Sequence, residues 1–240
     1  MANNKPELAA IQEEVVVCRA CPRLVAHREE VAVRKTRRFA EETYWGRPVP
    51  SFGDPQAQLL IVGLAPAAHG ANRTGRMFTG DRSGEWLFEA MYQYGFSTQP
   101  APASRKDGLK LENAYITAVV RCAPPANKPS RLEKETCRSF LVRELAALQR
   151  LRVVLALGKI GFDGFLAAWA EMGGQVPRPK PKFAHRAACT LADGLHLLAS
   201  YHPSQQNTFT GRLTRPMFHD VFREARRRVD APAGRAPSPS

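Results

Sequence analysis

Residues 59–70 read LLIVGLAPAAHG, the segment of the sequence that is most informative about the fold. The uninterrupted apolar run that ends at Gly63 predicts a strand buried on both faces of a sheet. Further short apolar runs at 115–120, 153–157 and 195–201 alternate along the chain with amphipathic stretches. This alternation predicts an α/β fold, with a single three-layer α/β/α domain around a central, mainly parallel four-stranded sheet.

The stretches between the expected strands carry apolar residues at helical spacing. We expect helices on both faces of the sheet at 84–94, 132–148, 159–169 and 214–229, and one more helix at 7–27. Composition divides the chain into three parts. Residues 1–50 are expected to form an N-terminal helix and a covering loop, 51–230 the main domain, and 231–240, rich in Pro, Ala and Ser, a disordered tail.

The chain carries 35 Lys and Arg against 22 Asp and Glu, which gives a formal net charge of +13. Such an excess favours polyanionic partners and an association that weakens with salt. The basic run at 226–228 either faces DNA or is a solvated helix end. No apolar run reaches the roughly 20 residues of a transmembrane helix, and residues 1–5 lack the apolar core of a secretory signal. We therefore expect a monomer in the reducing cytoplasm, without disulfide bonds.

Four of the five cysteines form a close pair and a wide pair. Cys18 and Cys21 belong to a CxxC turn followed by proline, and Cys122 and Cys137 lie about a hundred residues further on. A wide second pair is unusual for a zinc ribbon, whose second half repeats a tight knuckle. Four thiolates from distant parts of a chain also suit a [4Fe–4S] cluster. Cys189 lies in an apolar run and is expected to be a small buried hydrophobic residue.

Parallel sheets bind ligands outside the carboxyl ends of their strands. This rule indicates the loops that follow Gly63, Val120 and Tyr201 as the place of a site. Glycines at 70 and 75 have the spacing of a phosphate loop, but Arg and Met follow where that motif needs Lys and Ser or Thr, so binding of nucleoside triphosphates is not expected. His202 leaves its strand at the ligand edge, before a proline that stiffens the turn.

Four segments resemble the uracil-DNA glycosylase superfamily: GLAPAAHG at 63–70, GRMFTGD at 75–81, VRCAPPANKP at 120–129 and HPS at 202–204. Their wording is similar to the family 5 branch, in which, as in family 4, four cysteines in this arrangement hold an iron–sulfur cluster. The resemblance spans most of the chain. It implies the α/β fold of the superfamily, a [4Fe–4S] cofactor held by the two cysteine pairs, and residues 51–230 as the catalytic domain.

The resemblance also implies the roles of individual side chains. Phe78 should stack on a base flipped out of the duplex, and His202 should hydrogen-bond to the carbonyl oxygen of that base. Asp81 matches the acidic residue that the family places near the reacting sugar and water, and Asn127 matches the polar residue of the VRCAPP loop. The substrate pocket is expected to include Gly63, Leu64, Ala65 and Ser204.

Two positions depart from better-known branches. Ala65 stands where family 1 enzymes have an acidic residue that activates water, and Ala118 stands where family 4 has an asparagine. Both substitutions are typical of family 5, and both leave the identity of the general base open. Simpler roles also stay open: Phe78 as a core residue, Asp81 as the N-cap of a helix and Asn127 as a turn residue.

The implied activity is that of a monofunctional DNA glycosylase, which hydrolyses the N-glycosidic bond of uracil in DNA at the start of base excision repair. A donor at the base oxygen stabilises the leaving anion, and a carboxylate can stabilise the cationic sugar or orient water. With few polar groups to recognise the base, we expect activity on hypoxanthine and other deaminated bases too, in double- or single-stranded DNA. The alternative is an iron–sulfur or zinc protein that binds uracil-containing DNA without turnover.

Overall fold

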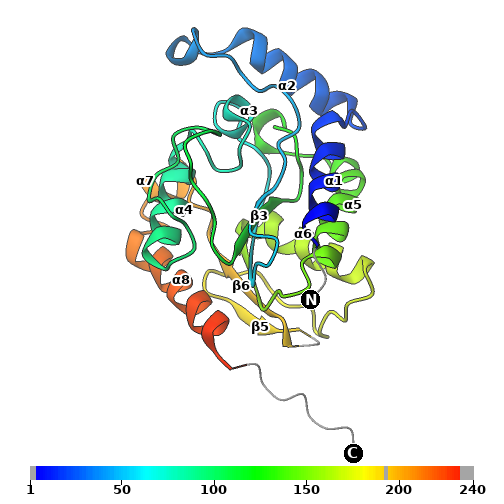
Figure 1. Ribbon diagram of the computed structural model, residues 1–240, viewed down its shortest axis with the longest axis vertical. Coiled ribbons are helices and arrows are strands. Elements are labelled where there is room, and N and C mark those ends of the chain that lie inside the picture. Colours follow the sequence, from blue (N-terminus) through cyan, green and yellow to red (C-terminus); the bar gives the residue numbers. More distant parts are fainter. Residues whose placement is uncertain (1–3, 192–193, 233–240) are drawn as a thin grey trace, which may run out of the picture.

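The computed structural model describes residues 4–191 and 194–232, and its strands form one sheet (Figure 1). The order across the sheet is β1-β3-β2-β4-β6-β5. Strands β2, β3, β4 and β6 are parallel to their neighbours in the centre, and β1 and β5 pair antiparallel at the two edges. The bounds are β1 (Phe52–Gly53), β2 (Leu59–Gly63), β3 (Ala114–Ala118), β4 (Val153–Leu157), β5 (Ala188–Thr190) and β6 (His196–Ser200).

The four central parallel strands were expected. The sheet has two further strands, one at each edge, that the expectation of a four-stranded sheet did not include. Every residue of β2, β3 and β4 is buried, which is why these strands appear in the sequence as uninterrupted apolar runs. The edge strands have only two and three residues, none of them buried. Strands so short and so exposed leave no apolar pattern in the sequence.

Helices cover both faces of the sheet, so the expected three-layer α/β/α architecture is confirmed (Figure 1). Helices α4 and α8 pack on one face, where Phe88, Phe218 and Phe222 share a core with the side chains of Ile61 and Leu155. Helices α1, α5 and α6 pack on the other face. The longer helices are α1 (Lys5–Val17), α2 (Pro22–Arg34), α4 (Arg82–Gln93), α5 (Arg131–Ala147), α6 (Gly158–Glu171) and α8 (Arg215–Asp230), and the short ones are α3 (Ala71–Thr74), α7 (Gln205–Phe209), η1 (Arg37–Phe39) and η2 (Pro125–Asn127).

The expectation of one helix over 7–27 is wrong, because the chain forms two helices that are separated at the CxxC turn. Cys18 ends α1 in an extended conformation, and Cys21 is also extended before Pro22, which is the first residue of α2. Proline disfavours helical geometry in the residue before it and suits the first turn of a new helix. The break therefore places the close cysteine pair in a connection between helices.

The N-terminal part of the chain contributes to the main core. Leu8, Ile11 and Val15 of α1 are buried in the same cluster as Leu60 of β2 and Val154 of β4. Of the expected disordered tail at 231–240, residues 233–240 lie outside the described residues. None of the helices in the described ranges is long and apolar enough to cross a membrane.

Candidate active site

The loops that follow β2, β3 and β6 enclose a cavity of about 420 Å³. These strands end at the same edge of the sheet: Gly63 of β2 pairs with Ala118 of β3, and β4, through Val62↔Ala156 and Leu157↔Ser200, joins β2 to β6 in parallel register. The cavity therefore lies where open α/β sheets bind ligands, and its volume is within the roughly 300–1,000 Å³ of ligand pockets. Seven of the eight residues expected at the site line it, namely Leu64, Ala65, Phe78, Asp81, Asn127, His202 and Ser204.

Phe78 and His202 present flat rings to each other in this cavity. Their ring centroids lie 5.9 Å apart, with the planes inclined by 25°. Phe78 has a φ of 53°, which L-residues rarely adopt, and it also packs against the core cluster on the α4 side of the sheet. Gly63, the eighth expected residue, lies behind the ring instead of in the wall: a Cβ at this position would be 2.9 Å from Cζ of Phe78.

His202 is partly buried in the cavity wall, and a hydrogen bond to its backbone fixes the turn that carries it. Nδ2 of Asn207 on α7 donates a hydrogen bond to the carbonyl oxygen of His202, at 2.8 Å. Before it, Tyr201 stacks on His185 at 5.1 Å between centroids. Loss of hydration lowers the pKa of His202 to about 4. At neutral pH the imidazole is therefore uncharged and can donate one hydrogen bond from one ring nitrogen.

Asp81 is the N-cap of α4 and a residue of the cavity wall at the same time. Its Oδ1 accepts a hydrogen bond from the backbone N–H of Gly84, at 3.0 Å. Burial raises the pKa of the carboxyl group, and the backbone N–H groups of the helix oppose this shift. Gly70 allows the carboxylate to approach, because a Cβ there would meet Oδ2 at 2.2 Å. The two roles left open by the sequence are thus compatible.

Asn127 reaches the cavity from the loop after β3, at the end of η2. Asn127 and the preceding Ala126 have φ angles of 56° and 51°, so two successive L-residues adopt the left-handed conformation. Strain of this kind persists only where the surrounding structure enforces it, and it concentrates at functional sites. The backbone N–H of Asn127 donates to the carbonyl of Pro124, so the residue shapes a turn as well.

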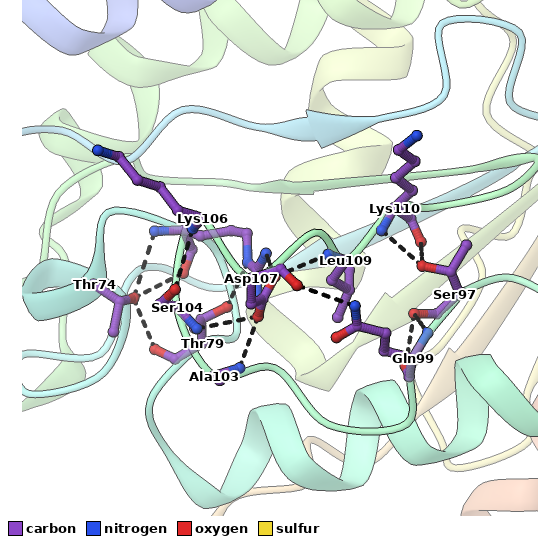
Figure 2. Close-up of polar contacts among 12 residues, drawn as sticks. Thr74, Thr79, Ser97, Gln99, Ala103, Ser104, Lys106, Asp107, Leu109 and Lys110 are labelled. Atoms are coloured by element: carbon purple, nitrogen blue, oxygen red, sulfur yellow. Dashed lines mark hydrogen bonds and ion pairs between the residues drawn. The ribbon is translucent and has the colours of Figure 1, made fainter.

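A buried ion pair supports the turn that carries Phe78. Arg76 forms two hydrogen bonds to the carboxylate of Asp107, at 2.8 and 2.7 Å, and its Nε donates to Oγ1 of Thr79. Figure 2 shows that Asp107 also accepts the backbone N–H groups of its own loop, at residues Ala103, Ser104 and Leu109. One carboxylate thus joins the 97–110 loop to the turn at 74–79.

Three polar residues of the cavity wall were missed by the sequence reasoning, namely Ser83, Lys128 and Gln206. Ser83 lies in the first turn of α4, two residues after Asp81, Lys128 follows Asn127 directly, and Gln206 lies at the start of α7, four residues after His202. The sequence indicates these three residues only through their positions, which are within a few residues of a motif residue along the chain. Which neighbours turn toward the cavity depends on the turns after each motif.

The four cysteines of the two pairs line one small cavity, apart from the first. Cys18 and Cys21 come from the connection of α1 and α2, Cys122 from the loop after β3, and Cys137 from α5. The remaining wall is largely apolar and includes Leu24, Val25, Val120 and Phe140. No three His, Cys, Asp or Glu side chains within the described ranges converge as ligands of a single metal ion.

The donor set of this cavity fits a [4Fe–4S] cluster, which takes four cysteine ligands. Burial raises the pKa of the Cys122 thiol, and it raises that of Cys137 to about 12. An opposing influence comes from Arg28, whose Nη1 donates a hydrogen bond to Sγ of Cys122 at 2.9 Å. A cationic donor at a ligand sulfur is what a group of buried thiolates requires.

Cys189 takes no part in that cavity. It lies on the edge strand β5 and packs against the core on the α1 side of the sheet, but its side chain is only half-buried. The expected apolar packing is found, but the residue is less buried than expected, because β5 is an edge strand of the described sheet.

The basic run at 226–228 lies at the opposite edge of the sheet from the candidate site. Arg152, which precedes β4, donates to the carbonyl of Val229 next to this run, at 2.7 Å. Arg227 and Arg228 both bond to Glu224, and Arg226 stacks over the ring of Phe96. These interactions favour a solvated helix end over a surface that faces DNA at the site.

Comparison with known proteins identifies the family of the chain. The model of the uracil DNA glycosylase superfamily matches residues 50–226. A type-5 uracil-DNA glycosylase of Thermus thermophilus is 50% identical over 91% of this chain and 96% of its own. One of Mycobacterium bovis is 49% identical over 95% of this chain and 84% of its own. A type-4 uracil-DNA glycosylase of Archaeoglobus fulgidus is 32% identical, over 55% of this chain and 57% of its own.

The parallel sheet, the two motif loops at its carboxyl edge and the match over residues 50–226 define the class of protein. The chain belongs to the uracil-DNA glycosylase superfamily and, with about half of its residues identical to type-5 members over nearly its full length, to the type-5 branch.

Proposed function

We propose that this protein is a monofunctional DNA glycosylase that hydrolyses the N-glycosidic bond of uracil in DNA. The observation that carries the proposal is the cavity itself. It brings Phe78, Asp81, Asn127 and His202 together from three loops at the ligand edge of the sheet. The type-5 relatives named above support the same activity.

His202 is proposed to stabilise the departing base. As the bond breaks, negative charge moves onto the base, and its carbonyl oxygen becomes a stronger acceptor. A neutral imidazole, which the lowered pKa ensures, donates its N–H to this oxygen without the cost of burying a second charge. Because the interaction strengthens only as charge develops, it lowers the barrier more than it tightens substrate binding.

Phe78 is proposed to hold the flipped base. A base that leaves the duplex loses its stacking, and a glycosylase replaces those contacts with flat side chains in a pocket. The phenyl ring offers such a surface beside His202, at 5.9 Å between ring centroids. This spacing leaves no room for a base between the two rings at the usual stacking distance, so His202 must shift aside when a base stacks on Phe78, to a position at the edge of the base from which its N–H can reach the carbonyl oxygen.

Asp81 and Asn127 are proposed to act at the sugar and the water. The carboxylate of Asp81 can stabilise the positive charge that builds on the sugar, or it can orient the attacking water. Its Oδ1 is occupied by the N–H of Gly84, so Oδ2 is the atom available for this task. Asn127 supplies an amide from the opposite loop, which can position water but cannot serve as a strong base.

Selectivity among deaminated bases is proposed to be loose. The apolar part of the cavity wall includes Leu64, Ala65, Pro66, Met77 and Phe78. An apolar wall distinguishes bases by size and stacking and not by hydrogen bonds, and it rejects analogues weakly. We therefore expect hypoxanthine to be excised as well as uracil.

A [4Fe–4S] cluster held by Cys18, Cys21, Cys122 and Cys137 is proposed as the cofactor, with the structural task of fixing α2, the loop after β3 and α5 relative to one another. Cys189→Ala should leave the iron content and brown colour unchanged, whereas Cys137→Ala should lower both. Purified protein with zinc and no iron would contradict the cluster, and so would loss of iron in Cys189→Ala.

The proposed activity is tested with a duplex that contains one uracil, in enzyme excess. We expect release of free uracil and an abasic site that breaks only after alkaline treatment. Matched duplexes with hypoxanthine or xanthine then rank the bases. Tight binding of the uracil duplex without release of the base would instead support the alternative of a binding protein without turnover.

A further inference from the structure

Arg28 is one of the largest fully buried side chains of the described residues, with 2% of its surface exposed. It lies on α2, one turn beyond Leu24 in the wall of the cysteine cavity. Its Nη1 donates to Sγ of Cys122 at 2.9 Å and to the carbonyl oxygen of Cys18 at 3.3 Å. Its Nε is buried and has no hydrogen-bond partner in the described part of the chain.

A buried arginine is ordinarily paired with a carboxylate, because an uncompensated charge is costly away from water. Arg121 follows this rule: its Nη2 bonds to the fully buried Glu144 at 2.6 Å. The acidic group recorded near Arg28 is Glu29, at 3.6 Å, but this side chain is 44% exposed and is bonded at 2.6 Å to Arg19. The negative charge that Arg28 requires is therefore not supplied by a buried carboxylate within the described ranges.

A neutral thiol does not supply that charge either, since a thiol is a weak acceptor. A group of thiolates does. The sulfur of Cys122 bonds to Arg28 directly, and the cavity behind it is lined by Cys18, Cys21 and Cys137. A buried guanidinium at this position is stabilised when the cysteines carry negative charge in the folded protein.

We propose that Arg28 is the charge partner of the cysteine-held cluster, and that it raises the reduction potential of the cluster and slows its loss. The inference rests on the [4Fe–4S] cofactor of the proposed function. A cluster held by four thiolates is negative and becomes more negative on reduction, so a neighbouring cation stabilises the reduced form more than the oxidised form. Net charge and hydrogen bonds to the sulfurs are among the factors that set cluster potentials.

The test compares three variants of the full-length protein, purified without oxygen. Arg28→Met keeps the length of the aliphatic chain but removes the charge and the donors. Arg28→Lys keeps the charge. Arg34→Met is the matched control, because Arg34 lies on the same helix, is 79% exposed and pairs only with Glu30 among the contacts recorded for it. The readouts are iron and sulfide per chain, the midpoint potential, and the rate at which the brown colour fades in air.

We expect Arg28→Met to shift the midpoint potential to more negative values and to fade faster, with Arg34→Met equal to wild type. If Arg28→Met retains no cluster, Arg28→Lys should restore iron, since the charge is what matters. Full iron with an unchanged potential in Arg28→Met would overturn the inference and leave the proposed function intact, as would a failure of Arg28→Lys to restore iron. Wild-type protein without iron would overturn the proposed cofactor itself, and this inference with it.

Discussion

The ring of Phe78 lies against the imidazole of His202, with 5.9 Å between centroids and 25° between planes. One residue comes from the loop after β2 and the other from the loop after β6, and β4 separates these two strands in the sheet. The pair therefore exists only when the sheet is assembled. It joins the proposed stacking surface to the proposed hydrogen-bond donor.

Removal of the imidazole should affect the chemical step more than binding. We expect His202→Ala to lower the single-turnover rate of uracil release by ~10²–10³-fold, because the lost donor acts on charge that develops in the transition state. Binding of a uracil duplex should weaken much less. Rapid-quench kinetics and a binding titration on the same duplex measure both quantities. Equal losses in the two would make His202 a residue of ground-state binding.

Gly63→Ala is expected to impair catalysis without destabilising the fold. The new Cβ would lie 2.9 Å from Cζ of Phe78, so the phenyl ring must move. Alanine is otherwise favoured over glycine in a strand by roughly 0.5–1 kcal/mol, which offsets the cost of the shift. A misplacement of about 1 Å near a reacting centre can reduce the rate by about 10²-fold. We expect the shift of the phenyl ring to reduce the rate of uracil release by at least about tenfold.

A double-mutant cycle shows whether this loss passes through the phenyl ring. In a Phe78→Ala background the added methyl group of Gly63→Ala meets no ring, so it should have little further effect on the rate. Independent, additive losses would place the effect of Gly63 elsewhere in the loop.

The parallel sheet could be predicted from the sequence because strands buried on both faces leave long apolar runs, such as the one that ends at Gly63. The helix break before Pro22 was also within reach, since proline disfavours helical geometry in Cys21. The edge strands β1 and β5 were not: β1 has two residues and pairs with a strand more than 60 residues further along the chain, and β5 has three residues, none of them buried, so it leaves no apolar run.

The motifs predicted which residues line the cavity, but they did not predict the residues that hold the motif loops and the cysteine cavity in place. Seven expected residues line the cavity because each follows a central strand or belongs to a motif loop. Asp107 lies in a loop without a motif, and its contact with Arg76 joins positions 31 residues apart. Arg28 likewise reaches Cys122 over 94 residues. Contacts of this kind arise from the packing of loops and helices, which no local pattern reports.

Asp107→Asn should destabilise the protein strongly. The buried Arg76 would lose its charge partner, and uncompensated burial of one member of an ion pair typically costs about 3–5 kcal/mol. Glu14→Gln is the matched control, because Glu14 pairs with Arg143 on the surface, where such pairs contribute about 0–1 kcal/mol. Urea unfolding measures both. A similar small loss in the two variants would show that the 97–110 loop does not hold the turn of Phe78.

Acid should destabilise the folded protein through His202. The pKa of this group is about 4 in the folded protein, against about 6.5 for an ordinary histidine in the unfolded chain. Between these values the unfolded chain binds a proton that the folded protein does not, so stability decreases as the pH falls from 6.5 to 4. The difference amounts to about 3 kcal/mol.

Other histidines contribute in the same direction, since burial also lowers the pKa of His69 and His185. The contribution of His202 is therefore read from the difference between wild type and His202→Asn, in urea unfolding at several pH values. This difference should change by about 3 kcal/mol between pH 7 and 4. Parallel curves would indicate that the ring is hydrated and titrates normally.

Asp81 has two roles in the structure, and two substitutions separate them. Oδ1 caps α4 through the N–H of Gly84, whereas the charge of the carboxylate is what the chemistry is proposed to use. Asparagine caps a helix as well as aspartate does, and alanine costs about 1 kcal/mol at an N-cap. We therefore expect Asp81→Asn to be as stable as wild type and Asp81→Ala to lose about 1 kcal/mol.

If the carboxylate acts on the sugar or the water, both variants should cleave more slowly, and Asp81→Asn should lose roughly 10- to 100-fold. This loss is smaller than the ~10²–10⁴-fold that a general acid or base can contribute. Stacking by Phe78 and the hydrogen bond from His202 persist in the variant and keep part of the rate enhancement. Single-turnover release of uracil, together with urea unfolding, decides between the roles. A wild-type rate in Asp81→Asn with a reduced rate in Asp81→Ala would show that Asp81 serves only as the cap of α4, and that Asn127 or the backbone positions the water.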